Sequence, residues 1–244
     1  MPIKIVKSKV KIQKSFSFYF YLVIFTLTFL LLPFLCYAAP CYGTKMPNKK
    51  ELFLGLQNYT VFKRYLKDNY GKFRSVQDFF LLSYGVFDWL TIDLKGGAGN
   101  MRQHPVGSDE IDYSTYLGGG YGFRLKVYDA HKLKTVFGFQ HISIHPKTIS
   151  LGAAKHKAVL DDWQFSLLVS RVFGKITPYI GTKWSNANYL HWIDGDRKLE
   201  KSDLTKSVGL LLGFDLPIAE KIWFNLEGQF FDGEALAVSV NYSF

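Results

Sequence analysis

The last eleven residues of the chain alternate without a break between large apolar and small side chains. The large parity consists of Leu236, Val238, Val240, Tyr242 and Phe244. Successive side chains of a β-strand point to opposite faces, so a period of two predicts a strand. Its outer face should meet an apolar medium and its inner face a wet one.

The stretch before this strand follows the same rule. Ile222, Phe224 and Leu226 share one parity, and the other parity holds Glu227 and Gln229. A carboxylate among apolar neighbours is costly in a dry core but acceptable in a hydrated lumen. The pattern therefore favours a barrel that spans a membrane over a soluble sandwich.

Along the rest of the chain the alternation predicts about ten strands, and eight to twelve would fit it. The clearest runs over fifteen residues, 113–127, and outlasts a typical soluble strand. Near Gln140 the parity slips, which predicts a β-bulge. Residues 96–109 and 194–203 are interpreted as long polar loops. The expected strands are 52–64, 76–86, 89–95, 113–127, 133–145, 162–172, 176–191, 208–216, 222–230 and 234–244.

Connections between these strands alternate between short and long. The short turns should face the periplasm and the longer loops the outside, as in bacterial barrels. The expected turns lie at Phe87, Asp129, Gly174 and Pro217, and the expected loops near Asn69, Gln103, Thr148, Gly195 and Asp232.

A closing strand with alternate hydrophobic residues and a final Phe244 resembles the assembly signal of bacterial outer-membrane β-barrel proteins. The resemblance implies an all-β, antiparallel up-and-down transmembrane barrel. It also implies outer-membrane lipid, lipopolysaccharide, periplasmic chaperones and the barrel assembly machinery as partners. Leu236, Val238, Val240, Tyr242 and Phe244 carry this signal.

The start of the chain has the layout of a signal peptide. Residues 1–14 hold five lysines and no acid, and residues 15–37 are uncharged. An uncleaved anchor is the alternative. We place the cleavage after Ala38, which gives a leader over 1–38, a periplasmic lead over 39–50 and a barrel over 51–244. The formal charge of +10 then belongs half to the leader. The predicted location is the bacterial outer membrane.

The rest of the composition argues against several function classes. Basic residues after the leader do not cluster as nucleic-acid binding requires. Only Cys41 remains there, so no intramolecular disulfide is expected. Metal-binding and phosphate-binding motifs are absent from the sequence, and we expect neither a metal nor a cofactor.

Charged residues on the inward parity form the first candidate site. Such groups need partners when buried, so we interpret them as a salt-bridge network that plugs the lumen, with a narrow hydrated path as the alternative. The expected lumen network is Asp93, Lys95, Arg124, Lys126, Lys183, Asp215 and Glu227.

Two enzyme readings remain as alternatives. His141 and Ser143 resemble the His-x-Ser core of outer-membrane lipid A deacylases, and side chains two apart on a strand share a face, so a base could reach a nucleophile. That family continues with Asn-Ala-Gly, whereas this chain has residues 144–146 as Ile-His-Pro. His191, Asp194 and Asp196 are close in sequence at the expected rim, and omptin-like proteases use acid and histidine residues there.

These observations lead to one expectation and two alternatives. We expect an integral outer-membrane barrel with a structural or surface-interaction role and a largely plugged polar lumen. A narrow porin-like channel for small solutes and a lipid A deacylase-like enzyme are the alternatives.

Overall fold

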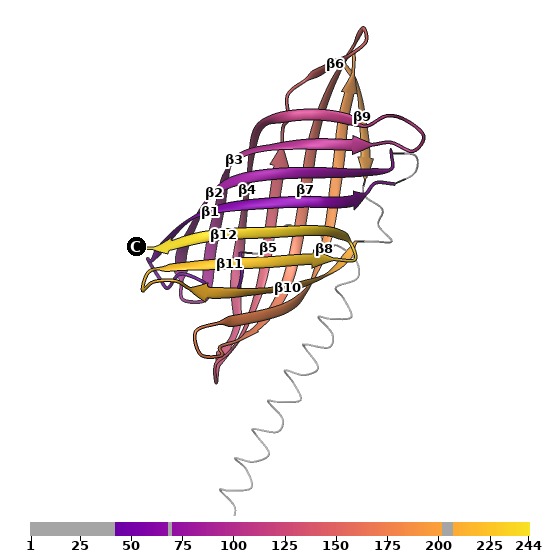
Figure 1. Ribbon diagram of the computed structural model, residues 1–244. Helices are drawn as coiled ribbons and strands as arrows, with labels where there is room; N and C mark the ends of the chain where they lie inside the picture. The colour runs from indigo at the N-terminus through magenta and orange to yellow at the C-terminus, as the bar shows by residue number, and fades with distance from the viewer. Residues whose placement is uncertain (1–41, 68–69, 202–206) are drawn as a thin grey trace, which may run out of the picture. The chain divides into compact units, whose positions relative to one another are not determined.

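The computed structural model describes residues 42–67, 70–201 and 207–244. For residues 199–201 it describes the backbone alone. The described residues form strands and turns and contain no α-helix. The predicted leader and Cys41 lie outside the described residues. The strands in Figure 1 are β1 (Leu52–Tyr65), β2 (Lys72–Phe87), β3 (Leu90–His104), β4 (Ile111–Ala130), β5 (Leu133–Ile144), β6 (Ile149–Leu151), β7 (Ala154–Arg171), β8 (Thr177–Ile193), β9 (Asp196–Lys201), β10 (Val208–Pro217), β11 (Ile222–Phe230) and β12 (Gly233–Ser243).

Ten of these strands close into a ring of antiparallel neighbours. The ring runs β1, β2, β3, β4, β5, β7, β8, β10, β11, β12, and β12 pairs with β1. The short strands β6 and β9 extend β7 and β8 as hairpin partners at one end. The prediction of an antiparallel up-and-down barrel of about ten strands is confirmed. No helix among the described residues is both long and apolar enough to cross a membrane.

The barrel has two ends that we name by their contents. The C-terminal rim holds Phe244 and the turns at 88–89, 131–132, 172–176 and 218–221. The distal rim holds residues 66–67 and 70–71 and the connections at 105–110, 145–148, 194–195 and 231–232. Both β6 and β9 lie at the distal rim, so this end carries the additional chain.

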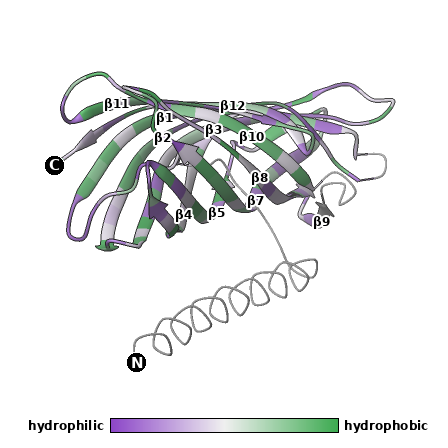
Figure 2. Cartoon of the chain, turned by 90° about the horizontal axis from the view of Figure 1, so that it is seen from below, coloured by the Kyte–Doolittle hydropathy of each residue, from purple (hydrophilic) through white to green (hydrophobic). Residues whose placement is uncertain are grey.

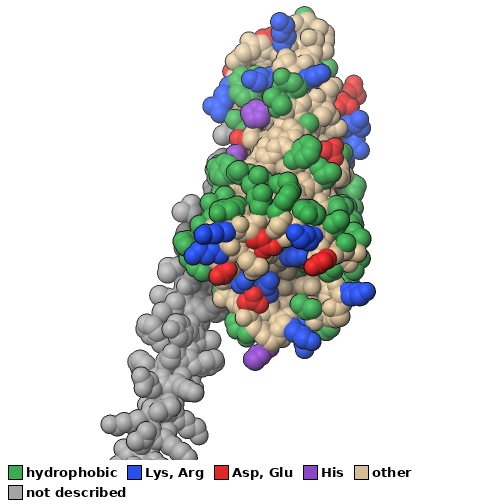
Figure 3. All heavy atoms as spheres, turned by 90° about the vertical axis from the view of Figure 1, so that its left-hand side faces the viewer, with side chains coloured by type: hydrophobic (Ala, Val, Ile, Leu, Met, Phe, Trp, Pro, Cys, Tyr) green, Lys and Arg blue, Asp and Glu red, His purple; other side chains and the backbone are tan. Residues whose placement is uncertain are grey.

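Inward and outward side chains differ in kind over most of the barrel wall. On β3, Asp93 is 0% exposed, whereas its neighbours Ile92 and Leu94 are 45% and 47% exposed. In Figure 2 the strands alternate between hydrophobic and hydrophilic residues along their length. Figure 3 shows a continuous area of hydrophobic side chains across one face, with charged groups beside it. A barrel wall of this kind meets lipid outside and polar groups inside.

The glycine-rich part of β3 corrects the expected loop over 96–109. The strand continues to His104, and Gly96 and Gly97 pair with Gly119 and Gly118 of β4. A Cβ at Gly97 would collide with the backbone carbonyl of Asp78. Small residues permit this close approach. They also carry little hydropathy contrast, so the alternation disappears where the pairing persists.

The predicted bulge near Gln140 is wrong. Pairing between β5 and β7 is regular from Leu133 to Ile144, and the nearby irregularity lies in β4, between Lys126 and Tyr128. The parity changes because Ile142 and Ile144 point into a part of the lumen that is itself apolar, and both are 2% exposed or less.

Two further expectations at the distal rim change. The alternation over 113–127 puts Tyr113 on the outward parity with Phe123 and Leu125, but Tyr113 points inward and is fully buried, because the pairing of β3 with β4 shifts between Gly99 and Met101. The expected loop over 194–203 contains β9, which pairs with β8 through a tight turn at Asp194 and Gly195. The charges of that hairpin obscured its strand character.

Candidate functional site

The lumen near the C-terminal rim is organised by an ion pair between neighbouring strands. Arg124 on β4 donates to Asp93 on β3 through Nη2 and Nε, at 2.8 and 2.9 Å. Ser83 on β2 donates its hydroxyl to the same carboxylate at 2.5 Å. Both charged side chains are at least 96% buried. A two-point guanidinium–carboxylate contact supplies the partners that buried charges need.

Residues 42–47, which precede β1, complete this cluster from inside the lumen. Arg124 donates from Nη1 to the carbonyl oxygen of Lys45 at 2.7 Å and to that of Tyr42 at 3.3 Å. The ammonium of Lys95 lies 4.2 Å from the Tyr42 ring centre and donates to Gln57 at 2.7 Å. The segment predicted as part of a periplasmic lead is thus bound by the barrel wall.

The other side of this segment contacts β10 and β11. Asn225 donates to Asp215 at 2.9 Å, and the Thr44 backbone also hydrogen-bonds to that carboxylate. The Lys45 ammonium lies 3.8 Å from the Trp223 ring centre. Burial lowers the pKa of Lys45, while Asp215 and Glu51 act in the opposite direction. Residues 42–47 therefore contact opposite walls of the lumen.

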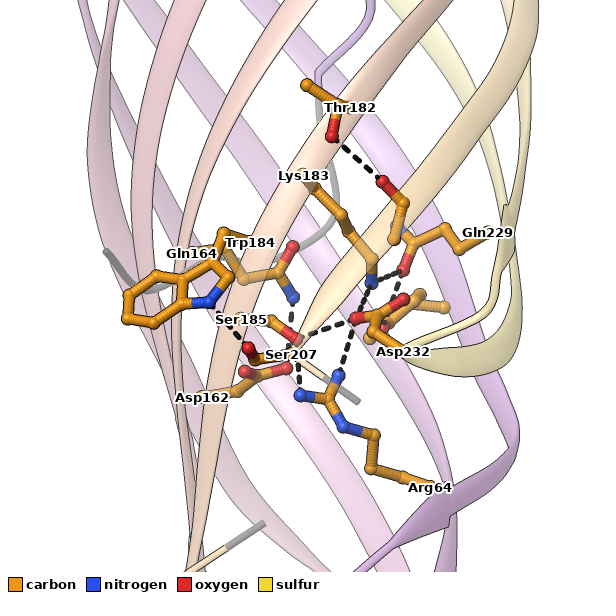
Figure 4. Close-up of polar contacts among 12 residues, drawn as sticks. Arg64, Asp162, Gln164, Thr182, Lys183, Trp184, Ser185, Ser207, Gln229 and Asp232 are labelled. Carbon is orange, nitrogen blue, oxygen red and sulfur yellow. Dashed lines mark hydrogen bonds and ion pairs between the residues drawn. The ribbon is translucent and has the colours of Figure 1, made fainter. Parts of the chain in front are cut away.

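A second cluster lies deeper in the barrel and is drawn in Figure 4. The carboxylate of Asp232 receives Arg64 and Lys183, each at 2.8 Å, and the Ser185 hydroxyl at 2.6 Å. Arg64 also donates to Ser185. Two strands, β1 and β8, and the last hairpin turn thereby converge on one buried carboxylate. One carboxylate between two cations is a compact arrangement for charges removed from water.

This central cluster continues through amide and phenol groups. Lys183 donates to the side-chain oxygen of Gln229 at 2.7 Å, and the Gln229 amide donates to Glu227 at 2.8 Å. Tyr179 donates its hydroxyl to the other oxygen of Glu227 at 3.1 Å. The chain of hydrogen bonds holds the charge of Glu227 at 0% exposure. Hydrogen-bonded polar side chains fill this level of the lumen.

Toward the distal rim the lumen becomes apolar. Phe73, Met101 and Ile144, from three different strands, are at most 2% exposed and belong to one packed cluster. The hydroxyls of Tyr113 on β4 and Tyr189 on β8 meet across this layer at 3.0 Å. Since β4 and β8 are not neighbours, this contact spans the lumen. It is the third level at which side chains fill the lumen, after the cluster near the C-terminal rim and the central cluster.

The structure brings most of the expected lumen residues into these clusters. Asp93, Lys95, Arg124 and Asp215 belong to the one near the C-terminal rim. Lys183 and Glu227 belong to the central one. Lys126 lies apart from both and forms an ion pair with Asp129 at 3.1 Å, near the turn that follows β4.

Sequence reasoning missed two residues of the central cluster. Asp232 was expected at an outward-facing hairpin tip, but it is 1% exposed and folds back into the lumen. Arg64 was not assigned to the lumen network, and it lies near an irregularity between Val61 and Arg64 that interrupts the count of alternation. A turn has no parity, so the alternation offered no signal for Asp232.

His141 and Ser143 share a face, and that face is the outer one. Ser143 donates its hydroxyl to Asp161 of β7 at 2.5 Å and lies 3.0 Å from Nε2 of His145. Nε2 of His141 lies 3.7 Å from the same Asp161 oxygen, and its ring packs against Trp163 with 4.1 Å between centres. Asp161 was not predicted, because only the pairing of β5 with β7 brings it to Ser143.

The residues expected at a protease-like rim do not converge. His191 points into the lumen and stacks on Tyr189, with 5.0 Å between ring centres. Asp194 lies in the β8–β9 turn and accepts the backbone N–H of Lys155 at 2.8 Å. The described part of the chain contains no group of three or more His, Cys, Asp or Glu side chains that could hold a metal ion.

Four residues of the expected assembly signal, Leu236, Val238, Val240 and Tyr242, lie on the outer face of β12, and the fifth, Phe244, follows its last residue. Val240, Tyr242 and Phe244 are 46%, 39% and 62% exposed. The strand pairs with β1 on one side and β11 on the other, so it closes the ring.

Comparisons with known proteins find similarity at the level of the fold. No protein family and no curated protein matches the sequence. Among solved structures, the chain is similar to the translocator domain of autotransporter NalP from Neisseria meningitidis, with 14% identity over 81% of this chain and 90% of that one and a TM-score of 0.45. The transport unit of autotransporter AIDA-I from Escherichia coli gives 12% identity, 84% and 93% coverage and a TM-score of 0.42.

The outer membrane protease OmpT from Escherichia coli is also similar, with 11% identity, 80% and 95% coverage and a TM-score of 0.41. The described strands themselves form a closed antiparallel ring with exposed apolar side chains outside and buried polar ones inside, which is the architecture of a transmembrane β-barrel.

Proposed function

We propose that the protein is an integral barrel of the bacterial outer membrane with a closed lumen and a structural or surface-interaction role. The apolar outer wall and the closing strand with its final Phe244 support this location. In this proposal the C-terminal rim faces the periplasm and the distal rim, with β6 and β9, faces the outside. Outer-membrane lipid and lipopolysaccharide surround the wall, and the chaperones and assembly machinery of the envelope handle the chain.

The observation that carries the proposal is the filling of the lumen at three levels. Residues 42–47 occupy the first, the Asp232 cluster the second, and the Tyr113–Tyr189 layer the third. Ion movement would have to separate buried charges from their partners, which costs several kcal/mol for a pair of this kind. A narrow porin-like channel would require at least one continuous polar path through all three.

Single-channel recording in planar bilayers tests the closed lumen. We expect no discrete current steps from the purified, folded protein. Gly43→Val is the sharper variant, because Gly43 has φ +70° and an added Cβ would lie 2.8 Å from Asn225 Nδ2 and Asp215 Oδ1. This variant should displace residues 42–47 and still conduct nothing, because two deeper levels remain. Steps from the unchanged protein would favour the channel.

A second candidate function, hydrolysis of an acyl ester in lipid A, is favoured by the outer-wall contacts of Ser143. In it, His145 rather than His141 is the base: the Ser143 hydroxyl turns from Asp161 to Nε2 of His145, its oxygen attacks the ester carbonyl, and His145 takes the hydroxyl proton and returns it to the leaving alcohol. Water, deprotonated by the same ring, then releases the fatty acid from the acyl-enzyme. Asp161 holds the serine before the attack, and the site faces the lipid where the substrate would lie.

Mass analysis of lipid A from cells that produce the protein tests this second candidate. Loss of one acyl chain should occur with the unchanged protein and not with Ser143→Ala. Ser150→Ala, an exposed serine of β6, is the matched control and should behave like the unchanged protein. Identical lipid A in all three strains would exclude the deacylase and leave the closed barrel standing.

A further inference from the structure

The distal end of the lumen holds a cavity of about 440 Å³, outside the three levels at which side chains fill the lumen. It lies above the fully buried Tyr113–Tyr189 pair, so it opens at the distal rim and ends blindly inside the barrel. Its volume falls in the range of pockets for small molecules, about 300–1,000 Å³. We call this cavity the vestibule, and its walls include Tyr70, Ile111, His156, Tyr189, His191 and Lys198.

Aromatic and aliphatic side chains form one wall of the vestibule. The rings of Tyr189 and His191 are stacked at 5.0 Å and 7°, and Tyr70 meets His191 edge-on at 5.5 Å. The buried Gln103 amide donates to the backbone oxygen of Tyr70 at 2.9 Å, which holds that residue over the cavity. Ile111 adds an aliphatic surface. This wall suits a flat apolar body that can pack against rings.

The other wall carries nitrogen-bearing polar side chains. His156 and Lys198 line it, and none of the vestibule's described lining residues is Asp or Glu. His156, at the start of β7, and Lys198, on β9, bring these nitrogen atoms from the two hairpins of the distal rim. An ammonium group and imidazole N–H groups bind carboxylate oxygens through charge-assisted hydrogen bonds. The charge therefore favours an anion.

We propose that the vestibule binds a small organic anion, specifically a carboxylate carried on an aromatic body. The ring packs against Tyr70 and the stacked Tyr189–His191 pair, and the carboxylate meets Lys198 and His156. Because the lumen is closed below, the site captures its ligand at the cell surface without passing it inward. This inference rests on the proposed closed barrel with its distal rim outside, and it gives the surface role a ligand class.

Calorimetric titration of the full mature barrel in detergent with 2-naphthoate tests the proposal. The neutral 2-naphthalenemethanol has the same ring system without the charge and serves as the first comparison. We expect saturable binding of the acid, with at least about tenfold weaker binding of the alcohol, the equivalent of one charge-assisted hydrogen bond. Equal affinity for the two compounds, or no binding of either, would overturn the proposal without any mutant being needed.

Two variants then locate the site. Lys198→Gln should weaken binding of the acid about tenfold and leave the alcohol unchanged. Tyr70→Ala should weaken both compounds. Lys157→Gln is the matched control, because Lys157 lies over the Trp192 ring at 5.0 Å on the outer face of the neighbouring strand pair. If Lys157→Gln weakened the acid as much as Lys198→Gln, the ligand would be outside the vestibule.

The titration and the conductance measurement fail separately. If the barrel shows no current steps and does not bind 2-naphthoate, the proposed closed lumen stands and the vestibule is not a ligand site. A conducting barrel that binds 2-naphthoate in a Lys198-dependent way would remove the closed lumen and retain the site.

Discussion

The inner and outer faces of the barrel wall differ in how their side chains are stabilised. Inside, Asp93 is 0% exposed and has Arg124 and Ser83 as specific partners at 2.8 and 2.5 Å. Outside, on the adjacent position of β3, Leu94 is 47% exposed and needs only an apolar surrounding. The inner face should therefore be sensitive to the loss of a partner, and the outer face to the gain of a charge.

The same contrast makes a carboxylate on the outer wall, that of Asp161, an exception to the pattern. Asp161 and Asp162 are neighbours on β7 that point to opposite sides. Asp162 is buried inside and accepts from Gln164 at 2.9 Å. Asp161 instead meets Ser143 and His141 on the outer wall. A carboxylate on a lipid-facing wall has to be explained by its contacts or by a ligand.

The largest effect should come from replacing both Tyr242 and Phe244 with Ser. These residues form the end of the outer face on the strand that closes the ring, so most of the folded barrel should be lost from the membrane fraction. Heat-dependent gel mobility of that fraction measures the folded share. The control is Val106→Ser with Phe231→Ser, two residues of the distal rim that are 64% and 76% exposed. Equal losses in both variants would contradict the special role of the closing strand.

On the inner face, Asp232→Asn should cost about 3–5 kcal/mol of unfolding free energy. The change leaves Arg64 and Lys183 buried without their common carboxylate. Urea unfolding of the barrel in lipid vesicles, followed by tryptophan fluorescence, measures it. Glu234→Gln, which removes the exposed ion pair with Lys63, should have a much smaller effect. An effect of Asp232→Asn no larger than that of the control would mean that the central cluster does not hold the lumen together.

On the outer face, Leu212→Arg should cost about 2–4 kcal/mol, because the cation would face the hydrocarbon layer. Val208→Arg, on the same face of β10 but beside the distal rim, should cost about 0–1 kcal/mol. The same unfolding measurement compares the two. A reversed order would put the distal rim, rather than the middle of β10, in the hydrocarbon. The inward-facing neighbour Gly213 cannot supply a control by substitution with Ser, since a Cβ there would collide with Tyr179 and the Leu226 carbonyl.

The smallest effect should follow from Ser83→Ala, at about 1–2 kcal/mol. This change removes one neutral donor from Asp93 and leaves both contacts from Arg124 in place. Ser150→Ala, in an exposed position of β6, should leave the unfolding midpoint where it is. If Ser83→Ala were as damaging as Asp232→Asn, the buried ion pairs would not be the dominant partners of the lumen.

The sequence by itself determined the wall of the barrel. Strict alternation in residues 222–230 and 234–244 predicted both strands and the faces of their side chains, and six of the seven expected lumen charges occupy the two clusters. The alternation is sufficient because a residue's side of the sheet depends only on its parity within the strand. Where the lumen itself is apolar, as at Ile142 and Ile144, hydropathy no longer distinguishes the faces.

Only the tertiary structure decided which residues meet. Asp232 reaches Arg64 and Lys183, Asp161 reaches Ser143, and Arg124 holds residues 42–47. Each of these contacts joins different segments of the chain. The contact between Asp161 and Ser143 depends on the register of β5 with β7, and the others depend on closure of the ring. Turns and the segment before β1 have no parity, so nothing in the alternation places them. The vestibule has the same origin, since Tyr70, His156 and Lys198 come from three separate segments that meet only at the distal end of the folded barrel.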